Sequence, residues 1–160
     1  MELLVREADF AAARDAAAIV DVLDSYASDP VGGGQPLRAE VRKRLVPALR
    51  EHATALVLLA FAAERPVGIA VCFYGFSTFE AKPLLNIHDL AVIPEYRGKG
   101  VGHALLRAAE DRARARRCCK LTLEVQDGNA RAQSLYSRFG FGDVVVNGSP
   151  TRFLSKIIRG

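Results

Sequence analysis

Hydrophobic residues recur at two spacings along this chain, at every second position in some segments and at every third or fourth position in others. The first spacing is typical of half-buried strands and the second of amphipathic helices. In a helix predicted over 36–52, the apolar residues are four positions apart: Leu37, Val41, Leu45 and Leu49. The first half of the chain is predicted to contain a strand over 3–8, helices over 11–26 and 36–52, and a hairpin of strands over 55–63 and 67–76.

The second half alternates strands with helices. The predicted elements are a loop through Pro83, a strand over 85–92, a helix over 101–117, a strand over 120–125, a helix over 130–139, and a closing hairpin near 143–146 and 151–158. Strands joined through a helix run parallel, so strands 85–92 and 120–125 are expected side by side in the middle of a mixed sheet. A ligand is expected where their carboxyl ends meet the segment that follows strand 85–92.

Length and composition indicate a single domain over 1–160, since the chain has 160 residues and 50% of them are hydrophobic. Uncharged runs such as 53–63 are too short to cross a bilayer, and charged residues among the first ten argue against a secretory signal. We therefore expect a soluble, cytoplasmic protein that is not bound to a membrane. Two of the three cysteines, Cys118 and Cys119, are adjacent and lack the spacing of zinc ligands, so no metal is expected.

The net charge of +4 is modest and favours anionic ligands without requiring nucleic acid. The sequence has no recognisable nucleic-acid-binding motif and no alternation of basic and aromatic residues. A nucleic-acid partner is therefore not expected.

A glycine-rich segment, Arg97-Gly98-Lys99-Gly100-Val101-Gly102, separates strand 85–92 from the helix that follows. Glycines let the backbone approach a ligand closely, and the start of a helix directs the positive end of its dipole at the same point. Arg97 and Lys99 add cationic side chains there. The segment predicts a phosphate site, although its spacing matches neither the Walker A loop nor the dinucleotide fingerprint.

With these residues identified, the chain resembles the GCN5-related N-acetyltransferase (GNAT) family. The segment from Leu90 to Gly102 is similar to that family's acetyl-CoA segment, whose core [QR]-x-x-G-x-[GA] is filled by Arg97, Gly100 and Gly102. A second block resembles a string common among bacterial members: Leu123-Glu124-Val125, then Asn129, Ala132, Leu135, Tyr136, Gly140 and Phe141. Together the two blocks cover residues 85–142.

The resemblance implies an α/β GNAT fold, with a mixed, mostly antiparallel central sheet, a splayed parallel strand pair and about four flanking helices. It also implies an N-acetyltransferase that moves the acetyl group of acetyl-CoA to a primary amine of a small molecule or peptide, by direct attack in a ternary complex. An acyl-CoA-binding sensor without turnover is the alternative. Members of the family often dimerise, so a homodimer is also considered.

For the cofactor, the resemblance implies that backbone N–H groups of the glycine segment hold the pyrophosphate. Main-chain groups of Leu90 and Val92 are expected to pair with the pantetheine arm, and the N–H of Leu90 to bind the thioester carbonyl as it becomes an oxyanion. Asn129 is expected to cap the next helix and to contact the cofactor arm. The cofactor-binding residues are thus expected to be Leu90, Ala91, Val92, Arg97, Gly98, Lys99, Gly100, Val101, Gly102, Asn129 and Tyr136.

For catalysis, the resemblance assigns Tyr136 as the general acid toward the departing sulfur. The acceptor amine must lose a proton before it attacks, and His88 is the candidate general base, directly or through water, or else a structural residue. Glu124, predicted on the neighbouring strand, and Asp89 are the rival bases. Alternation along strand 85–92 predicts two faces, one with Asn86, His88 and Leu90 and the other with Ile87, Asp89 and Ala91.

The acceptor pocket in this family is shaped by the first two helices, their connection and the loop before strand 85–92. Here these loops are 26–36 and 76–83. The aromatic residues Phe73, Tyr74, Phe76 and Phe79 are candidates for its wall, and the acidic residues Asp29 and Glu80 for attracting a cationic acceptor.

Overall fold

The structure, a computed structural model, describes residues 1–158. The chain divides into two compact units, one of residues 1–123 and one that starts at Glu124. In the described residues, no helix is long and apolar enough to span a bilayer.

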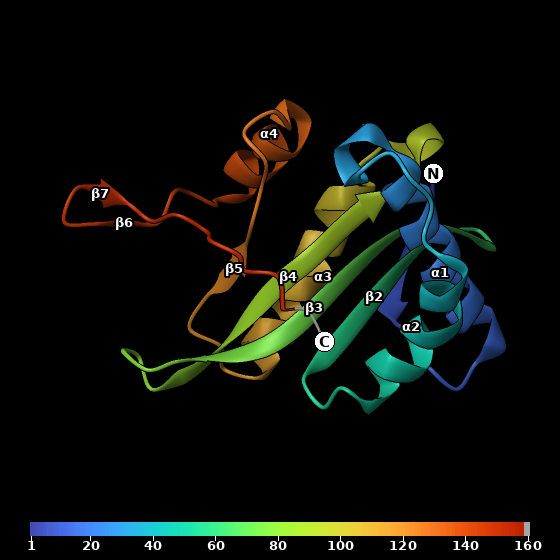
Figure 1. Cartoon of the computed structure of the whole chain (residues 1–160), viewed down its shortest axis with the longest axis horizontal. Helices are drawn as coiled ribbons and strands as arrows, with labels where there is room; N and C mark the ends of the chain where they lie inside the picture. Colours follow the sequence, from blue (N-terminus) through green and yellow to red (C-terminus); the bar gives the residue numbers. More distant parts are fainter. Residues whose placement is uncertain (159–160) are drawn as a thin grey trace. The chain divides into compact units, whose positions relative to one another are not determined.

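The first unit is built on a five-stranded sheet (Figure 1). Its strands lie in chain order: β1 (Leu3–Glu7), β2 (Ala55–Ala62), β3 (Arg65–Ser77), β4 (Lys82–Val92) and β5 (Leu121–Leu123). Neighbours from β1 to β4 are antiparallel, whereas β4 and β5 are parallel. This is the mixed, mostly antiparallel sheet with one parallel pair that the sequence predicts.

Both faces of the sheet are covered in its centre. Residues 56–62 of β2 and 67–72 of β3 are all buried, which explains their nearly uninterrupted apolar sequence. One face packs against α3 (Val101–Ala115), because a Cβ on Gly68 would meet the side chains of Val101 and Leu105. The alternate residues of β3 point to the other face, which packs against α1 (Ala13–Ser28).

The helices of the first unit form from amphipathic segments. α1 buries Ala18, Ile19, Val22 and Leu23, and α3 buries Val101, Leu105, Leu106, Ala109 and Ala113, both at spacings of three or four. α2 (Ala39–Glu51) follows α1 through a short 3-10 helix, η1 (Pro30–Gly32). A second 3-10 helix, η2 (Pro94–Tyr96), lies between β4 and α3.

The second unit contains α4 (Ala130–Phe139), which matches the predicted helix. The Asn129 side chain accepts a hydrogen bond of 3.1 Å from the Ala132 N–H at its start, and Gly140 ends it at a φ of 109°. β6 (Val145–Val146) and β7 (Ser149–Pro150) form a separate two-stranded sheet.

Four sequence predictions are wrong in detail. β3 and β4 stay paired as far as Ser77 and Lys82, so the loop predicted over 76–83 is only a short turn. β5 lies at the edge of the sheet rather than in its middle, and it ends at Leu123, before Glu124. Residues 151–158 form no strand, because apolar sequence alone makes no strand without a partner to pair with. The closing hairpin is instead the short pair of β6 and β7, outside the central sheet.

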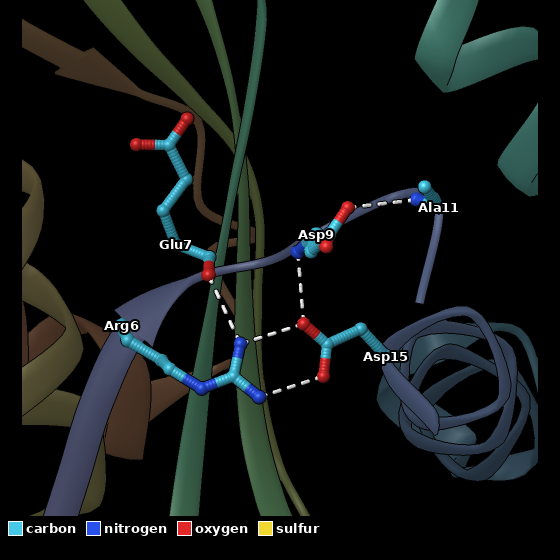
Figure 2. A network of polar contacts seen from close by, with 5 residues as sticks. All are labelled: Arg6, Glu7, Asp9, Ala11 and Asp15. Carbon is cyan, nitrogen blue, oxygen red and sulfur yellow. Dashed lines mark hydrogen bonds and ion pairs between the residues drawn. The ribbon is translucent and has the colours of Figure 1, made fainter. Parts of the chain in front are cut away.

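An ion pair joins the first strand to the first helix (Figure 2). The Arg6 guanidinium donates two hydrogen bonds, of 2.6 and 2.7 Å, to the two carboxylate oxygens of Asp15. The Asp9 N–H donates a third, of 2.8 Å, to the same carboxylate. The Asp15 side chain is buried, and the Arg6 hydrogen bond is the main reason why its pKa is lowered. This network fixes the start of α1, which has no capping side chain.

We expect Asp15→Asn to lower the free energy of unfolding near neutral pH by about 2 kcal/mol, because hydrogen bonds between charged groups contribute about 1.5–3 kcal/mol. A lowered pKa stabilises the fold above the ordinary carboxyl pKa of about 4, and this stabilisation is lost as the pH falls through the folded-state pKa. Urea unfolding between acidic and neutral pH should therefore show a shallower pH dependence in Asp15→Asn than in wild type. Asp21→Asn, an exposed acid on the same helix, is the control; equal slopes for wild type and Asp15→Asn would contradict the role of the pair.

Candidate active site

The parallel strand pair separates before β4 ends. β5 pairs with β4 only from Leu85–Leu121 to Ile87–Leu123, while β4 continues to Val92 beside β3. The Asn86 amide donates a hydrogen bond of 3.0 Å to the Thr122 hydroxyl near the last paired position. Within the first unit, the last part of β4 therefore has a strand partner on one side only.

The main-chain groups of Leu90 and Val92 point to the side of β4 away from β3. The Ile93 N–H donates to the Val67 carbonyl on the β3 side at 3.0 Å, and successive residues of a strand direct their N–H and C=O groups to opposite sides. These are the two residues whose main chain the family resemblance implies for the pantetheine arm. The splayed strand edge that such an arm requires is present in the first unit.

A β-bulge interrupts β4 at His88. In the register with β3, Asp89 is opposite Val71 and Ile87 is opposite Cys72, so His88 is an extra residue. Val71 and Cys72 are consecutive and point to opposite faces, and their partners Asp89 and Ile87 therefore do the same. The simple alternation predicted for this strand, with Ile87 and Asp89 on one face, is wrong.

The bulge brings His88 and Asp89 to the same face of the sheet. Phe73 lies on the face of β3 that carries Val71, the partner of Asp89, and its ring contacts the His88 ring at a centroid distance of 5.6 Å. The His52 ring also contacts the Phe73 ring, at a centroid distance of 4.9 Å. An exposed imidazole and a half-buried carboxylate therefore lie next to each other on this face.

Tyr26, near the end of α1, belongs to the same neighbourhood. Burial raises the pKa of Tyr26, and the negative charges of Asp89 and Asp29 raise it further. Burial also raises the pKa of Asp89, which the nearby His88 partly offsets. The face therefore combines the Asp89 carboxylate, a phenol and an imidazole. The sequence included Tyr26 only as the first residue of the acceptor loop expected over 26–36.

The glycine turn has the geometry of an anion site. Gly98 and Gly100 have φ values of 72° and 85°, and a Cβ on either residue would have no heavy atom within 4 Å. Gly100 is also the N-cap of α3 and supplies no capping side chain, so the first N–H groups of the helix remain available. Together with the helix dipole, this arrangement suits a phosphate.

The two cations of the turn are placed differently. Lys99 is exposed, and its ammonium group lies 5.0 Å from the centroid of the Tyr96 ring. The Arg97 guanidinium instead forms an ion pair of 2.7 Å with Asp29, and its Nε donates a hydrogen bond of 3.0 Å to the Val92 carbonyl. The sequence places both side chains at the anion-facing edge of the turn, whereas the structure directs Arg97 to a carboxylate.

Close packing against β3 sets the position of α3. A Cβ on Gly68 would lie 2.8 Å from Val101 Cγ1, 3.0 Å from Leu105 Cδ1 and 3.1 Å from the Ala91 carbonyl oxygen. Val101 is the first residue of α3, and Ala91 lies in β4. Gly68 therefore allows the start of the helix to lie directly on the sheet.

Three of the four aromatic residues suggested for an acceptor wall lie elsewhere. Tyr74 is on the α3 face, where its ring is 4.2 Å from the Arg116 guanidinium, and Phe76 and Phe79 are exposed near the β3–β4 turn. That turn precedes β4 and the glycine turn follows it, so they lie at opposite ends of the strand, roughly 30 Å apart. Glu80 is in the same distant turn, and only Phe73 is near His88.

The remaining predicted residues belong to the second unit. Glu124 is exposed and follows the end of β5, so it is not a strand residue as predicted. Tyr136 lies on α4, is 9% exposed, and contacts the Phe141 ring at 5.9 Å in an edge-to-face arrangement. Asn129 caps the same helix.

Comparisons with known proteins agree on one family. A sequence profile of the acetyltransferase (GNAT) family matches residues 19–141. The uncharacterized N-acetyltransferase YhfO of Bacillus subtilis is 32% identical over 133 residues, which cover 79% of this chain and 83% of that protein. The crystal structure of a possible acetyltransferase from Clostridium difficile 630 has the same fold, with a TM-score of 0.79, 19% identity, and coverage of 99% of this chain and 100% of that one.

Two relatives with named substrates match over shorter segments. Thialysine N-epsilon-acetyltransferase of Bos taurus is 33% identical over 78 residues, which cover 49% of this chain and 45% of the relative. Streptothricin acetyltransferase of Streptomyces lavendulae is 49% identical over 57 residues, which cover 36% of this chain and 30% of the relative. The chain thus spans less than half of each of these two relatives.

The close packing at Gly68 predicts that Gly68→Ala destabilises the fold by about 1–3 kcal/mol, the usual effect of adding atoms to a well-packed core. Gly75→Ala, in the same strand, is the matched control. Its Cβ would meet only the flexible Leu84 side chain, at 3.2 Å. It should be neutral or stabilising by up to about 1 kcal/mol, because alanine restricts the unfolded chain. Urea unfolding of both variants measures the difference, and equal stabilities would contradict it.

Proposed function

Because the chain belongs to the GNAT acetyltransferase family, we propose that it transfers the acetyl group of acetyl-CoA to a primary amine of a small molecule or peptide. The observation that carries the proposal is the separation of β4 from β5 just before the glycine turn. An extended arm and a diphosphate need, in sequence, a free strand edge and an anion-binding turn. β4 and the turn after it supply both along one continuous stretch of chain.

The residues present suit the donor. Backbone N–H groups between Arg97 and Gly102 are proposed to hold the pyrophosphate, with Gly98, Lys99, Gly100 and Val101 in the same segment. Three features support this phosphate site: the positive φ values, the open space beside two glycines and the uncapped start of α3. Leu90 and Val92 are proposed to pair with the amides of the pantetheine arm along the free edge, with Ala91 between them.

The proposed reaction is a direct transfer. A neutral amine nitrogen attacks the thioester carbonyl carbon, a C–N bond forms, and the C–S bond breaks as the sulfur leaves with its electron pair. The attacking nitrogen gives up one proton to the base or to water, which leaves a neutral amide. The Leu90 N–H is proposed to stabilise the negative charge that develops on the carbonyl oxygen. Tyr136 is proposed to protonate the departing thiolate, an assignment that rests on its position in the second sequence block. Asn129 is proposed to contact the cofactor arm on the same basis.

An amine is mostly protonated at neutral pH, so a base must remove a proton before attack. The bulge supports His88 for this role, acting directly or through water, because it places the imidazole beside the half-buried Asp89. Asp89 and Glu124 remain the alternative bases. The raised pKa of Asp89 gives its carboxylate a higher proton affinity than an exposed carboxylate has.

The acceptor is proposed to be a cationic amine. Phe73, Tyr26 and the Asp89 carboxylate gather on the face that carries the bulge. Two relatives are named for the amines thialysine and streptothricin, which supports this class. Release of free CoA thiol from acetyl-CoA in the presence of a panel of amines, polyamines and peptides tests the proposal. Calorimetric binding of acetyl-CoA without thiol release on any acceptor would instead favour a sensor without turnover.

Two variants should affect acetyl-CoA binding and the catalytic rate separately. Gly100→Glu should abolish acetyl-CoA binding, because its side chain would place a negative charge where the diphosphate is proposed to bind. Gly100→Ala, with the same positive φ but no charge, should bind more tightly than Gly100→Glu. Tyr136→Phe should keep the wild-type affinity and lower kcat by about a hundredfold or more. Calorimetry and the thiol-release assay measure these effects, and equal donor affinity in Gly100→Glu and Tyr136→Phe would contradict this division.

The base assignment predicts the pH dependence of kcat/KM. A base acts only when deprotonated, so activity should decline as the pH falls through its pKa. His88→Ala should remove this acidic limb and lower the rate by about a hundredfold. If the limb persists in His88→Ala but disappears in Asp89→Asn, Asp89 is the base. A limb unchanged in both variants would exclude them both and direct attention to Glu124 or bound water.

A further inference from the structure

An ion pair joins two segments of the first unit that are 68 residues apart in the sequence. Asp29 begins the connection between α1 and α2, and Arg97 begins the glycine turn. Their side chains meet at 2.7 Å, and the exposed fractions are only 15% for Asp29 and 22% for Arg97. A pair so well shielded from water interacts more strongly than an ordinary surface ion pair.

Asp29 also organises the connection that it begins. Its carboxylate accepts a hydrogen bond of 3.0 Å from the Val31 N–H. Its carbonyl oxygen accepts two more, of 2.8 Å from the Gly32 N–H and 2.9 Å from the Gly34 N–H. The conformation of residues 29–34 is therefore built around Asp29.

The other end of the same connection is held by a second aspartate. Asp24 accepts a hydrogen bond of 2.8 Å from the Leu37 N–H and forms an ion pair of 2.6 Å with Arg42 of α2. The connection is thus fixed to α1 and α2 at its far end. At its near end, the Arg97 side chain links Asp29 to the glycine turn.

The same guanidinium reaches the free edge of β4. Arg97 Nε donates a hydrogen bond of 3.0 Å to the Val92 carbonyl, which points away from β3. One side chain therefore contacts the strand end proposed for the donor arm and the connection proposed for the acceptor. Two of the three guanidinium nitrogens, Nε and Nη2, are thus already bonded to protein acceptors.

We propose that Arg97 is a positioning residue, which with Asp29 holds the acceptor-side connection against the donor strand, and that its side chain is not a phosphate ligand. This rests on the proposed function, in which the end of β4 serves the donor, and on the family resemblance, which implies that the connection between α1 and α2 shapes the acceptor pocket. Loss of the pair therefore loosens residues 30–37 and weakens acceptor binding, while acetyl-CoA affinity is nearly unchanged. If the Arg97 side chain were instead a phosphate ligand, its loss would weaken acetyl-CoA binding and leave residues 30–37 unchanged.

The test compares Arg97→Gln, Asp29→Asn, the double variant and Lys99→Gln. Asp29→Asn removes the charge that pairs with Arg97 but keeps an oxygen to accept from the Val31 N–H. Lys99→Gln removes an exposed cation from the same turn without touching the pair. Amide hydrogen exchange of residues 30–37, the calorimetric Kd for acetyl-CoA, and the KM of the best amine found in the panel are measured for each.

We expect hydrogen exchange of residues 30–37 and the amine KM to rise about tenfold in both single variants. The double variant should be no worse than either single variant, because both remove the same interaction. The Kd for acetyl-CoA should change by less than about threefold, and Lys99→Gln should leave the exchange of residues 30–37 as in wild type.

The proposal is overturned if Arg97→Gln weakens acetyl-CoA tenfold with unchanged exchange in residues 30–37, or if Asp29→Asn tightens acetyl-CoA binding by freeing Arg97. If Arg97→Gln does not fold, Asp29→Asn alone decides between these outcomes. Hydrogen exchange needs no acceptor and no turnover. A wild-type protein that fails to bind acetyl-CoA would therefore refute the proposed function, while the exchange data still decide whether the pair holds the connection.

Discussion

The early end of the pairing between β4 and β5 is the constraint on which the proposed site depends. A parallel pair of full length would use the N–H and C=O groups of both strands in the sheet. Here β5 pairs no further than Leu123, while β4 continues to Val92. Main-chain groups of β4 beyond Ile87 thus have no strand partner on one side within the first unit, in front of a turn shaped by Gly98 and Gly100.

The β-bulge lies on the side of β4 that pairs with β3, and it sets which face of the sheet the nearby side chains point to. It turns His88 and Asp89 toward the face of α1, next to Phe73, while Leu90 and Val92 keep their main-chain groups on the free edge. One strand therefore presents main-chain groups for a donor and side chains for an acceptor. This division explains how a single extended segment can serve a two-substrate reaction.

Local sequence patterns predicted much of this structure, because they record local requirements. Apolar spacing predicted the helices and the succession of strands along the chain, although not the edge position of β5, and α4 matches its predicted range of 130–139. The glycines after β4 predicted a turn followed by a helix that starts at Val101, and the structure has both, with positive φ at Gly98 and Gly100. Each of these features depends on residues within one or two turns of the chain.

The features that were missed depend on distant residues. The bulge at His88 is defined by its register with β3, and the early end of β5 by its register with β4. The pairing of Arg97 with Asp29 spans 68 positions, and each residue alone resembles an ordinary surface charge. Extra strand at 151–158 was predicted because apolar composition does not reveal whether a partner strand exists.

An amide NMR titration with acetyl-CoA tests the central claim most directly, since it observes main-chain N–H groups that side-chain substitutions cannot remove. The largest shifts are expected at Leu90, Val92 and the segment from Arg97 to Gly102. Saturable binding that shifts other amides and leaves these unchanged would show that the free edge of β4 and its glycine turn are not the donor site.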